Sequence, residues 1–251
     1  MMKSNENQLQ EIAIPQVLVD AYLRKKGLIL IVGNRFSHIG KTLVSLKKKG
    51  DPSFSGTTVC LAREEFAELE KYKFTICSYG NMSEAKTRKL MSESSVLVFE
   101  NILFEDELTA AINSCEEGRL VIAHVSSNSI INALHRIYGL ALQTQNPHLL
   151  WRVIDNLNLL FSQTTIVNAK METAFAHELV LASSEVKKCL WQGQLFEFEE
   201  LMKNSGENSG IVTMNQSLLQ LIIRRRIEIK TAFEICRDPV DLDHLLKKVG
   251  V

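Results

Sequence analysis

Short runs of apolar and β-branched residues alternate with segments of helical pattern through the first half of the chain. The runs occupy residues 28–32, 57–62, 74–77, 95–99 and 120–125. Continuous apolar runs of this length are typical of strands that are buried on both faces of a parallel sheet. Helical patterns separate them at residues 42–49, 84–91 and 108–115. The alternation predicts an α/β fold around a central, mainly parallel sheet.

The second half of the chain has a different pattern. Helical segments dominate after the last of these runs, and residues 164–167 and 175–180 are predicted to add a small contribution to the sheet. We expect residues 11–140 to form the core of one domain and residues 141–251 to form its C-terminal part with a helical tail. Residues 1–10 are mostly polar and are expected to be a disordered N-terminus.

Three local patterns mark helix ends in this second half. A helix that begins at Ser184 is expected to stop at Gly193, because glycine readily adopts the left-handed conformation that ends helices. Thr213 and Gln216 have the spacing of a capping box at a helix start. Asp238 comes directly before a proline, which predicts an N-cap that opens the last helix.

Composition narrows the class of protein. The chain has 251 residues, of which 45% are hydrophobic, so it suits either one large α/β domain or a domain with a small helical appendage. With 29 basic and 29 acidic side chains it gives no indication of a nucleic-acid partner. Its five cysteines are scattered, which fits reduced thiols in a cytoplasmic protein and neither a disulfide framework nor a zinc site. No apolar run reaches the length of a membrane span or of a secretory signal, so no transmembrane segment is expected.

The segment after the first apolar run contains the parts of a phosphate loop. Such a loop has the spacing G-x-x-x-x-G-K-[ST], in which backbone N–H groups surround one phosphate, the lysine reaches the next and the hydroxyl binds Mg²⁺. Gly33, Gly40, Lys41 and Thr42 are therefore candidate nucleotide-binding residues, and Thr42 is the candidate magnesium ligand. Six residues separate the two glycines instead of four, and counting back from the lysine places Arg35 where the first glycine belongs.

The residues inside this loop are also unusual. Phe36 and Ile39 stand at positions where a phosphate loop needs small residues that allow positive φ and close approach of the backbone to phosphate. A rebuilt loop that still binds nucleotide is one interpretation. We favour the other, a vestigial connection between a strand and a helix.

Several further segments match a known family. The family's pattern is given in parentheses after each matching segment of this chain. The segments are 24–33 (R-G-L-[IV]-L-V-T-G), 82–85 with 95–100 (F-S-E-A, then D-[VI]-[IL]-L-V-G-E), 117–137 (E-T-G-H-L-V…H-T-N-S…D-R-I), 186–194 (A-I-R-N-L-I-R-E-G-K) and 210–218 (G-M-Q-T-[FL]-D-Q-[AS]-L). In this order they resemble the hexameric ATPases of type IV pili and type II secretion, and most closely the pilus-retraction (PilT-like) branch. Phosphate loops occur in many proteins, whereas the last segment is specific to this family.

The resemblance covers the chain from about residue 12 onward and only the family's C-terminal domain, so we expect no counterpart of its N-terminal domain. It implies a RecA-like P-loop domain with a helical C-terminal subdomain, with ATP and Mg²⁺ as cofactors. It also implies an oligomer whose partners are pilus or secretion ATPase subunits and inner-membrane platform proteins. The resemblance implies a location in the cytoplasm, with or without peripheral attachment to the inner membrane.

The resemblance assigns a catalytic role to Glu100. This residue ends an apolar strand at the position of the family's Walker B glutamate, where a carboxylate can orient water or metal. The sequence Asn101-Ile102-Leu103 then replaces the family's M-R-D, so an expected arginine is lost.

Two other catalytic segments of the family depart from its pattern. The acidic box that supplies the general base falls between residues 57 and 70, where the motif is missing. Glu64 or Glu65 could substitute, but a solvated helix face is the favoured interpretation. The family's histidine position falls on Ser126, and His124 lies two residues earlier on the same strand face. We expect His124 to be a strand histidine without a catalytic role.

Together these departures predict a degenerate motor domain. Loss of a general base costs about 10²–10⁴ in rate, and loss of a transition-state donor costs about 3–4 kcal/mol more. We therefore expect a weakly hydrolysing or non-hydrolysing protein that acts in type IV pilus or secretion machinery through protein contacts. The alternatives are an active ATP-hydrolysing motor subunit and a nucleotide sensor that does not hydrolyse.

Two surface features leave alternatives open. The three consecutive arginines at residues 224–226 could form a basic patch for an anionic partner, although complementing a helix dipole is the favoured interpretation. Trp191 is either a core residue or an exposed anchor for a partner protein.

Overall fold

The computed structural model describes residues 12–35, 37–50, 58–63, 66–143, 148–167, 172–205 and 209–250. The strands in this part of the chain are β1 (Gly27–Val32), β2 (Thr58–Ala62), β3 (Thr75–Ser78), β4 (Val96–Phe99), β5 (Leu120–Val125), β6 (Leu157–Val167), β7 (Thr173–Leu181) and β8 (Ile211–Val212). The α-helices are α1 (Gln16–Leu23), α2 (Ile39–Lys49), α3 (Ala85–Glu93), α4 (Glu105–Glu116), α5 (Ile130–Gln143), α6 (Leu149–Asn156), α7 (Ser184–Trp191), α8 (Leu195–Asn204), α9 (Met214–Ile223), α10 (Ile229–Ile235) and α11 (Pro239–Val249). Two 3₁₀ helices, η1 (Ala67–Tyr72) and η2 (Tyr79–Asn81), flank β3.

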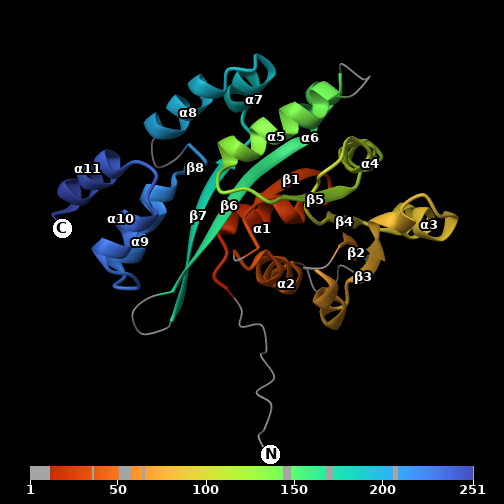
Figure 1. Cartoon of the computed structure of the whole chain (residues 1–251), viewed down its shortest axis with the longest axis horizontal. Coiled ribbons are helices and arrows are strands. Elements are labelled where there is room, and N and C mark those ends of the chain that lie inside the picture. The colour runs from red at the N-terminus through yellow and green to blue at the C-terminus, as the bar shows by residue number, and fades with distance from the viewer. Residues whose placement is uncertain are drawn as a thin grey trace, which may run out of the picture.

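The described strands form one sheet in the order β3-β2-β4-β5-β1-β6-β7-β8 (Figure 1). The strands from β3 to β6 in this order run parallel to one another. Strand β7 is antiparallel to β6, and β8 is antiparallel to β7. The predicted α/β fold with a mainly parallel sheet is therefore confirmed.

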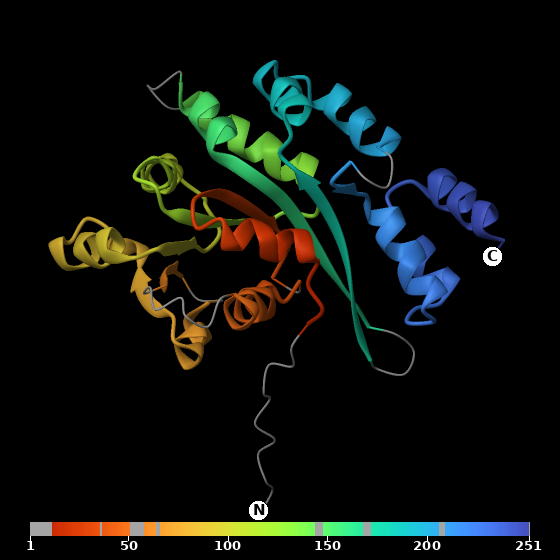
Figure 2. The same ribbon diagram turned by 180° about the vertical axis from the view of Figure 1, so that it is seen from behind.

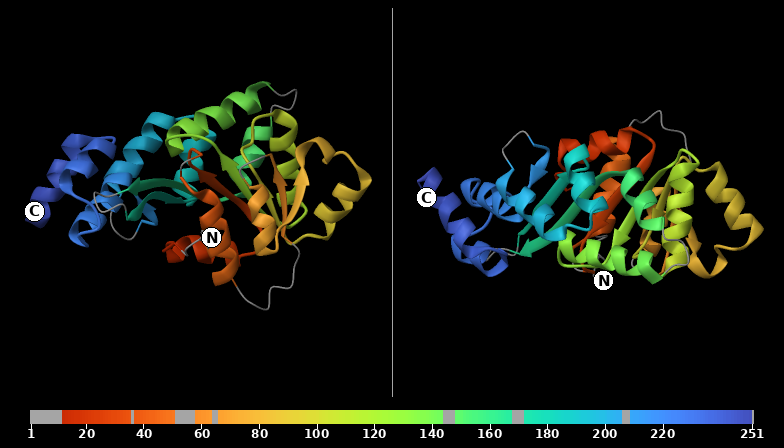
Figure 3. Two further views of the ribbon diagram at one scale, coloured as in Figure 1. Left: turned by 60° about the horizontal axis from the view of Figure 1, so that its bottom comes forward. Right: turned by 90° about the horizontal axis from the view of Figure 1, so that it is seen from above.

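The sheet lies between two layers of helices, as the views from three sides show (Figures 1, 2 and 3). Strand β1 is buried on both faces, and its side chains alternate between two apolar clusters. Leu28, Leu30 and Val32 pack in the cluster that contains the buried faces of α4 to α8. Ile29 and Ile31 pack in the cluster that contains α1 and α2. This two-sided burial explains why the sequence of β1 is continuously apolar.

Strands β6 and β7 form a long antiparallel hairpin, which corrects the small sheet contribution expected from the sequence. The expected segments 164–167 and 175–180 are only parts of the two strands. The missing part begins at Leu157, directly after α6, in an apolar run. A short apolar run that follows a helix without glycine or proline has no signal to separate strand from helix.

Helices α9, α10 and α11 form the helical tail beside the hairpin (Figure 1). Their apolar faces share a third cluster with Ile166 and Ala176 of the hairpin. The predicted capping box is confirmed, since the backbone N–H of Gln216 donates to the Thr213 hydroxyl at 3.2 Å. Asp238 caps α11 as predicted.

Other predictions for this half have mixed outcomes. The helix that begins at Ser184 ends at Trp191, and Gly193 two residues later has a φ of 67°, as expected for a helix-ending glycine. The division of the chain at residue 140 stays a prediction. Within the described residues, no helix is long and apolar enough to cross a membrane.

Candidate functional site

The loops that follow β1 and β5 leave their neighbouring strands toward opposite faces of the sheet. The loop after β1 leads to α2 on one face, and the loop after β5 leads to α5 on the other. Such a divergence opens a crevice at the carboxyl edge of a parallel sheet, where ligands of α/β proteins bind. The predicted phosphate loop and Glu100 both follow strands that end at this edge.

The phosphate-loop segment closes on itself in a tight turn. The backbone N–H of Asn34 donates to the Ser37 hydroxyl at 3.0 Å, and the backbone N–H of Ser37 donates to the Asn34 carbonyl at 2.9 Å. The backbone N–H of Gly33 is directed at the carbonyl of Val125 on β5, at 3.4 Å. A phosphate cradle needs such N–H groups to be free for the ligand. Here these three are already used inside the protein.

Gln163 on β6 fixes the other end of the turn. The hydroxyl of Thr42 donates to Gln163 Oε1 at 2.8 Å, and Gln163 Nε2 donates to the carbonyl of Ser37 at 2.6 Å. Thr42 is 0% exposed and Gln163 is 3% exposed. The hydroxyl that was the candidate magnesium ligand is therefore covered by the protein itself and donates its proton to a buried amide. In this conformation the loop residues do not fit a nucleotide with its magnesium ion.

The residue that opens α2 is held in an unusual conformation. His38 has φ 54° and ψ 40°, in the left-handed region that costs a non-glycine residue free energy. Its Nδ1 lies 3.0 Å from the hydroxyl of Thr165 on β6. Gln163 and Thr165 are two residues apart on one strand, so both point to the same face and contact the same loop. No sequence motif pointed to these two residues, because their role depends on the position of β6 beside β1.

The two glycines of the loop differ in what the structure requires of them. A Cβ on Gly33 would lie 2.8 Å from the Cβ of Ser37, which is too close, so the tight turn needs a glycine there. A Cβ on Gly40 would meet only Leu69 at 3.7 Å, an ordinary contact. Gly40 matches the phosphate-loop motif in sequence but performs no backbone function in this fold.

Lys41 lies in the first turn of α2 and is half-buried. Its side chain lines a groove between α2, the start of β7 and α9. Among the described residues its ammonium has no hydrogen-bond or ion-pair partner. The phosphate-loop lysine is thus free to meet an anion.

Glu100 is buried and fixed by backbone groups. Its Oε2 accepts hydrogen bonds from the backbone N–H groups of Arg63 at 2.7 Å and Phe66 at 3.3 Å. Its own carbonyl accepts a hydrogen bond from the Tyr79 hydroxyl at 2.8 Å. The carboxylate therefore holds the turn after β2 in place. Its assignment as a Walker B glutamate stays a prediction.

Arg63 stands at the end of β2, in the region where the resemblance implies an acidic box. Its guanidinium forms an ion pair with the buried Glu107 of α4 and lies 4.1 Å from the ring centroid of Tyr79. Glu64 and Glu65, the expected substitutes for a general base, lie outside the described residues, as does Phe36. Among the residues that are described, the charge that ends β2 is thus a cation in a fixed ion pair.

His124 on β5 is 2% exposed, and its Nε2 donates to the carbonyl of Gly33 at 3.0 Å. Burial lowers the pKa of His124 to about 4, against an opposing effect of the hydrogen bond to Gly33. The ring is therefore neutral at pH 7, with its proton on Nε2, and Nδ1 has no partner in the described part of the chain. This arrangement ties β5 to the turn after β1 and fits the expected non-catalytic histidine.

Comparisons with known proteins were made on the whole chain. No family model matches it. The chain is 20% identical to the type IV pilus ATPase PilU of Pseudomonas aeruginosa over 98% of its own length and 66% of the length of PilU. The pilus retraction motor PilT with bound ADP superposes with a TM-score of 0.76 at 19% identity, over 97% of this chain and 71% of PilT. The Legionella pneumophila ATPase DotB superposes with a TM-score of 0.71 at 13% identity, over 88% of this chain and 63% of DotB.

The chain is related to the type IV pilus and secretion ATPases. The resemblance seen in the sequence is thereby confirmed, and so is the RecA-like fold. The chain spans just under two thirds of the length of the curated relative that it matches. Of the three residues that the sequence predicts for the site, Lys41, Thr42 and Glu100, the last two are fixed by contacts inside the protein.

Proposed function

We propose that the chain is a weakly hydrolysing or non-hydrolysing member of the pilus and secretion ATPases that acts in type IV pilus or secretion machinery through protein contacts. The observation that carries this proposal is the bridge from Thr42 through Gln163 to Ser37, which lies fully buried at the candidate magnesium hydroxyl and ties the loop to β6. The chain is similar to the type IV pilus ATPase PilU and to the pilus retraction motor PilT, and these two proteins suggest the cellular setting.

The chemistry of phosphoryl transfer explains why such a site is weak. The reaction depends almost entirely on positioning and electrostatic stabilisation of the phosphates. A loop whose N–H groups are used internally provides neither, and Arg63 at the end of β2 is a cation where a base would be needed. Lys41 alone can attract phosphate but cannot place a water molecule for attack.

Exposed apolar residues support a role in protein contacts. Trp191 at the end of α7 is 44% exposed and Phe196 on α8 is 73% exposed, so Trp191 is not a core residue. Aromatic side chains of this kind are enriched at protein interfaces. We infer an oligomer with pilus or secretion ATPase subunits, in the cytoplasm and near inner-membrane platform proteins. The proposed division into residues 11–140 and 141–251 would present this face from the C-terminal part.

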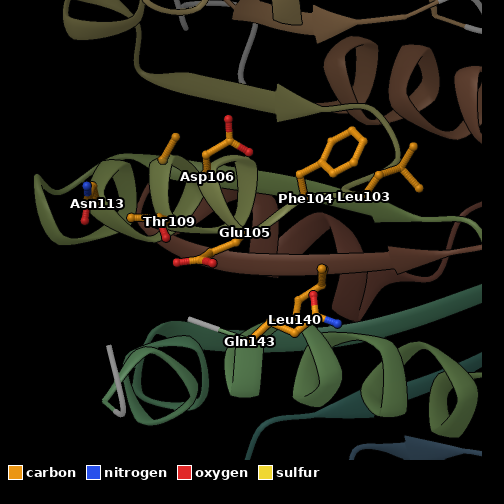
Figure 4. A pocket seen from close by; sticks show the side chains of 9 residues that line it. Leu103, Phe104, Glu105, Asp106, Thr109, Asn113, Leu140 and Gln143 are labelled. Carbon is orange, nitrogen blue, oxygen red and sulfur yellow. The ribbon is translucent and has the colours of Figure 1, made fainter. Parts of the chain in front are cut away.

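A shallow hollow of about 810 Å³ between α4 and α5 offers a second contact surface (Figure 4). Phe104 is 60% exposed at its edge, and Glu105 and Asp106 follow on α4. Leu140 and Gln143 face them from α5. An apolar floor with an acidic rim fits a basic amphipathic segment of a partner protein.

Phosphate release at steady state tests the proposal. We expect the rate of the purified chain with ATP and Mg²⁺ to equal that of Lys41→Ala and of buffer or to exceed them only slightly. A release that rises with Mg²⁺ and disappears in Lys41→Ala would instead show an active motor. Tight ATP binding without release would favour the nucleotide sensor.

Co-purification with an intact motor from the same cell tests the contact surface. The double variant Trp191→Ala with Phe196→Ala should reduce recovery of the motor, because it removes two exposed aromatic anchors. Trp151→Ala is the matched control, since Trp151 is 52% exposed on α6. Equal recovery with all variants would exclude the α7–α8 surface as the contact.

A further inference from the structure

The helical tail, α9 to α11, packs mostly on itself. Among the described residues, its buried apolar side chains form a cluster to which the β6–β7 hairpin adds only three members, Ile166, Ala174 and Ala176. Two of these are alanines, so little apolar surface joins the tail to the sheet. Parts of a chain that bury little surface against each other can separate at a low cost in free energy. Polar contacts therefore decide how firmly the tail is held.

A buried amide ties the helices of the tail together. Asn215, near the start of α9, is 4% exposed, and its Nδ2 donates to the carbonyl of Asp238 at 2.8 Å and to Asp241 Oδ2 at 2.7 Å. Asp238 is also the N-cap of α11. The link between α10 and α11 is thus fixed to α9 at the residue next to Arg237. Any movement of the tail away from the sheet therefore moves Arg237 with it.

Arg237 reaches from this link to two other parts of the protein. Its Nη1 donates to both carboxylate oxygens of Glu178 on β7, at 2.9 and 2.8 Å. Its Nη2 donates to the carbonyl of Asn128, in the loop after β5, at 2.7 Å. Glu178 is 4% exposed, and in the described part of the chain Arg237 is the only cation that forms an ion pair with it. Loss of this contact would leave a buried carboxylate without a counter-charge, which is costly.

The two contacts of Arg237 belong to strands that are not neighbours in the sheet. Glu178 pairs with Ser162 of β6, and Ser162 pairs with Val32 at the end of β1. Val32 pairs in turn with Val125 at the end of β5, three residues before Asn128. Three strand spacings, about 14 Å, therefore separate β5 from β7. The loop after β5 must cross the end of β1 toward β7 to bring Asn128 within reach of the guanidinium.

The loop after β5 borders the candidate site. The backbone N–H of Ser126 donates to Asn101 Oδ1 at 3.0 Å, which ties this loop to the loop after β4. The carbonyl of Val125, directly before the loop, accepts the hydrogen bond from the N–H of Gly33 in the turn after β1. The position of the loop therefore sets one side of the crevice at the carboxyl edge of the sheet. The tail reaches this loop through Arg237.

We propose that Arg237 is a latch that joins the docking of the tail to the conformation of the loop after β5. With the tail on the sheet, one guanidinium neutralises the buried carboxylate of Glu178 and holds the loop at Asn128. Any contact that draws α9 to α11 away from the hairpin breaks both interactions at once, because both belong to one side chain. The tail and the edge of the crevice are therefore one two-state element. This inference goes beyond the proposed function and does not depend on it, since it concerns contacts within the chain.

Hydrogen exchange of the full chain, measured by mass spectrometry, tests the latch. In Arg237→Gln, peptides from residues 126–133 and 214–249 should exchange faster together, by about tenfold or more, as expected for the loss of hydrogen bonds between charged groups. Helix α3 lies at the opposite end of the molecule from the tail (Figure 1), so its exchange should not change. Arg225→Gln is the matched control in the same tail. It should exchange like the wild type, because the guanidinium of Arg225 forms no hydrogen bond or ion pair with the described residues.

Two further variants separate a latch from a general stabilising contact. Lysine carries one point charge where arginine has several donors in a fixed fork, so Arg237→Lys can pair with Glu178 but cannot also hold Asn128. It should keep most of the protection of the tail and lose that of the loop. The double variant Arg237→Gln with Glu178→Gln leaves no buried carboxylate unpaired, so it should fold even where Arg237→Gln does not. Its loop should still exchange faster than in the wild type, since the contact with Asn128 is missing.

The outcomes decide between coupling and simple packing. Faster exchange of the tail in Arg237→Gln with no change in the loop would overturn the inference, because the loop would then not depend on the latch. Unchanged exchange of both segments would overturn it as well, and so would a loop that keeps its protection in Arg237→Lys. The measurement needs neither ATP nor a partner protein, so failure of this inference leaves the proposed function standing.

Discussion

Replacing Gln163 by leucine is the perturbation that most directly tests the closed loop. The substitution keeps the approximate size of the side chain but removes both buried hydrogen bonds, from Thr42 and to the carbonyl of Ser37. Each buried group that loses its partner costs about 1–3 kcal/mol. We therefore expect the free energy of unfolding to fall by about 2–5 kcal/mol, a large part of the stability of a typical domain.

Urea denaturation followed by tryptophan fluorescence measures this change. Thr165→Val is the matched control on the same strand, because its hydrogen bond to His38 is exposed. That control should change the free energy of unfolding by no more than about 0.5 kcal/mol. Hydrogen exchange of residues 37–42 should become faster in Gln163→Leu and remain slow in the control.

A double-mutant cycle with Thr42→Val decides whether the two side chains act together. In the wild type, Thr42→Val removes a buried hydrogen bond, whereas in Gln163→Leu the hydroxyl has already lost its partner. The interaction energy should therefore lie in the range of about 0.5–3 kcal/mol that is found for residues in contact. A cycle that closes to zero, or a Gln163→Leu variant as stable as the wild type, would refute the bridge.

Two other predictions concern the same turn. Gly33→Ala should destabilise the protein clearly, because the new Cβ would lie 2.8 Å from the Cβ of Ser37. Gly40→Ala should be neutral or should stabilise the protein by up to about 1 kcal/mol. Thermal melts compare the two variants, and equal effects would contradict the geometry. The stability should also fall as the pH decreases from about 6.5 to about 4, because the folded pKa of His124 is lowered and the unfolded chain therefore binds more protons in this window. Denaturation series across this pH range should show that His124→Gln reduces the slope of the free energy of unfolding against pH. The remaining slope comes from His177, whose pKa is also lowered. An unchanged slope would show that His124 is not neutral and buried.

The fold was predictable because its signals are local or repeated. Each parallel strand of the first half is an apolar run that is bounded by polar or glycine residues, and Thr213 with Gln216 announces a helix start within four residues. The hairpin of β6 and β7 was underestimated, since its start at Leu157 continues directly from a helix. Its full length follows from pairing between two distant strands, and neither strand alone indicates that pairing.

The contacts of the candidate site residues could not be predicted from the sequence, and the assignment of those residues stays a prediction. The sequence placed Lys41 and Thr42 in the segment that follows one strand and Glu100 at the end of another, and the fold brings the ends of those two strands to one edge of the sheet. The partners that fix Thr42 and Glu100 are Gln163 and the backbone N–H groups of Arg63 and Phe66, which come from other parts of the chain. Residues that meet only in the folded chain are not separated by a characteristic number of residues, so no sequence pattern predicts such contacts.

These contacts give three of the residues considered for the candidate site a structural role in the fold. Thr42 satisfies a buried amide, the Glu100 carboxylate accepts two backbone hydrogen bonds, and His124 donates to the carbonyl of Gly33. Each of these three side chains is buried, so its loss would leave an unsatisfied polar group and would destabilise the fold without any change in catalysis. Lys41 differs, because its ammonium has no hydrogen-bond or ion-pair partner among the described residues and its side chain is half-buried in the groove between α2, β7 and α9. A substitution there should therefore change anion binding and leave stability unchanged, whereas substitutions at the other three should do the reverse.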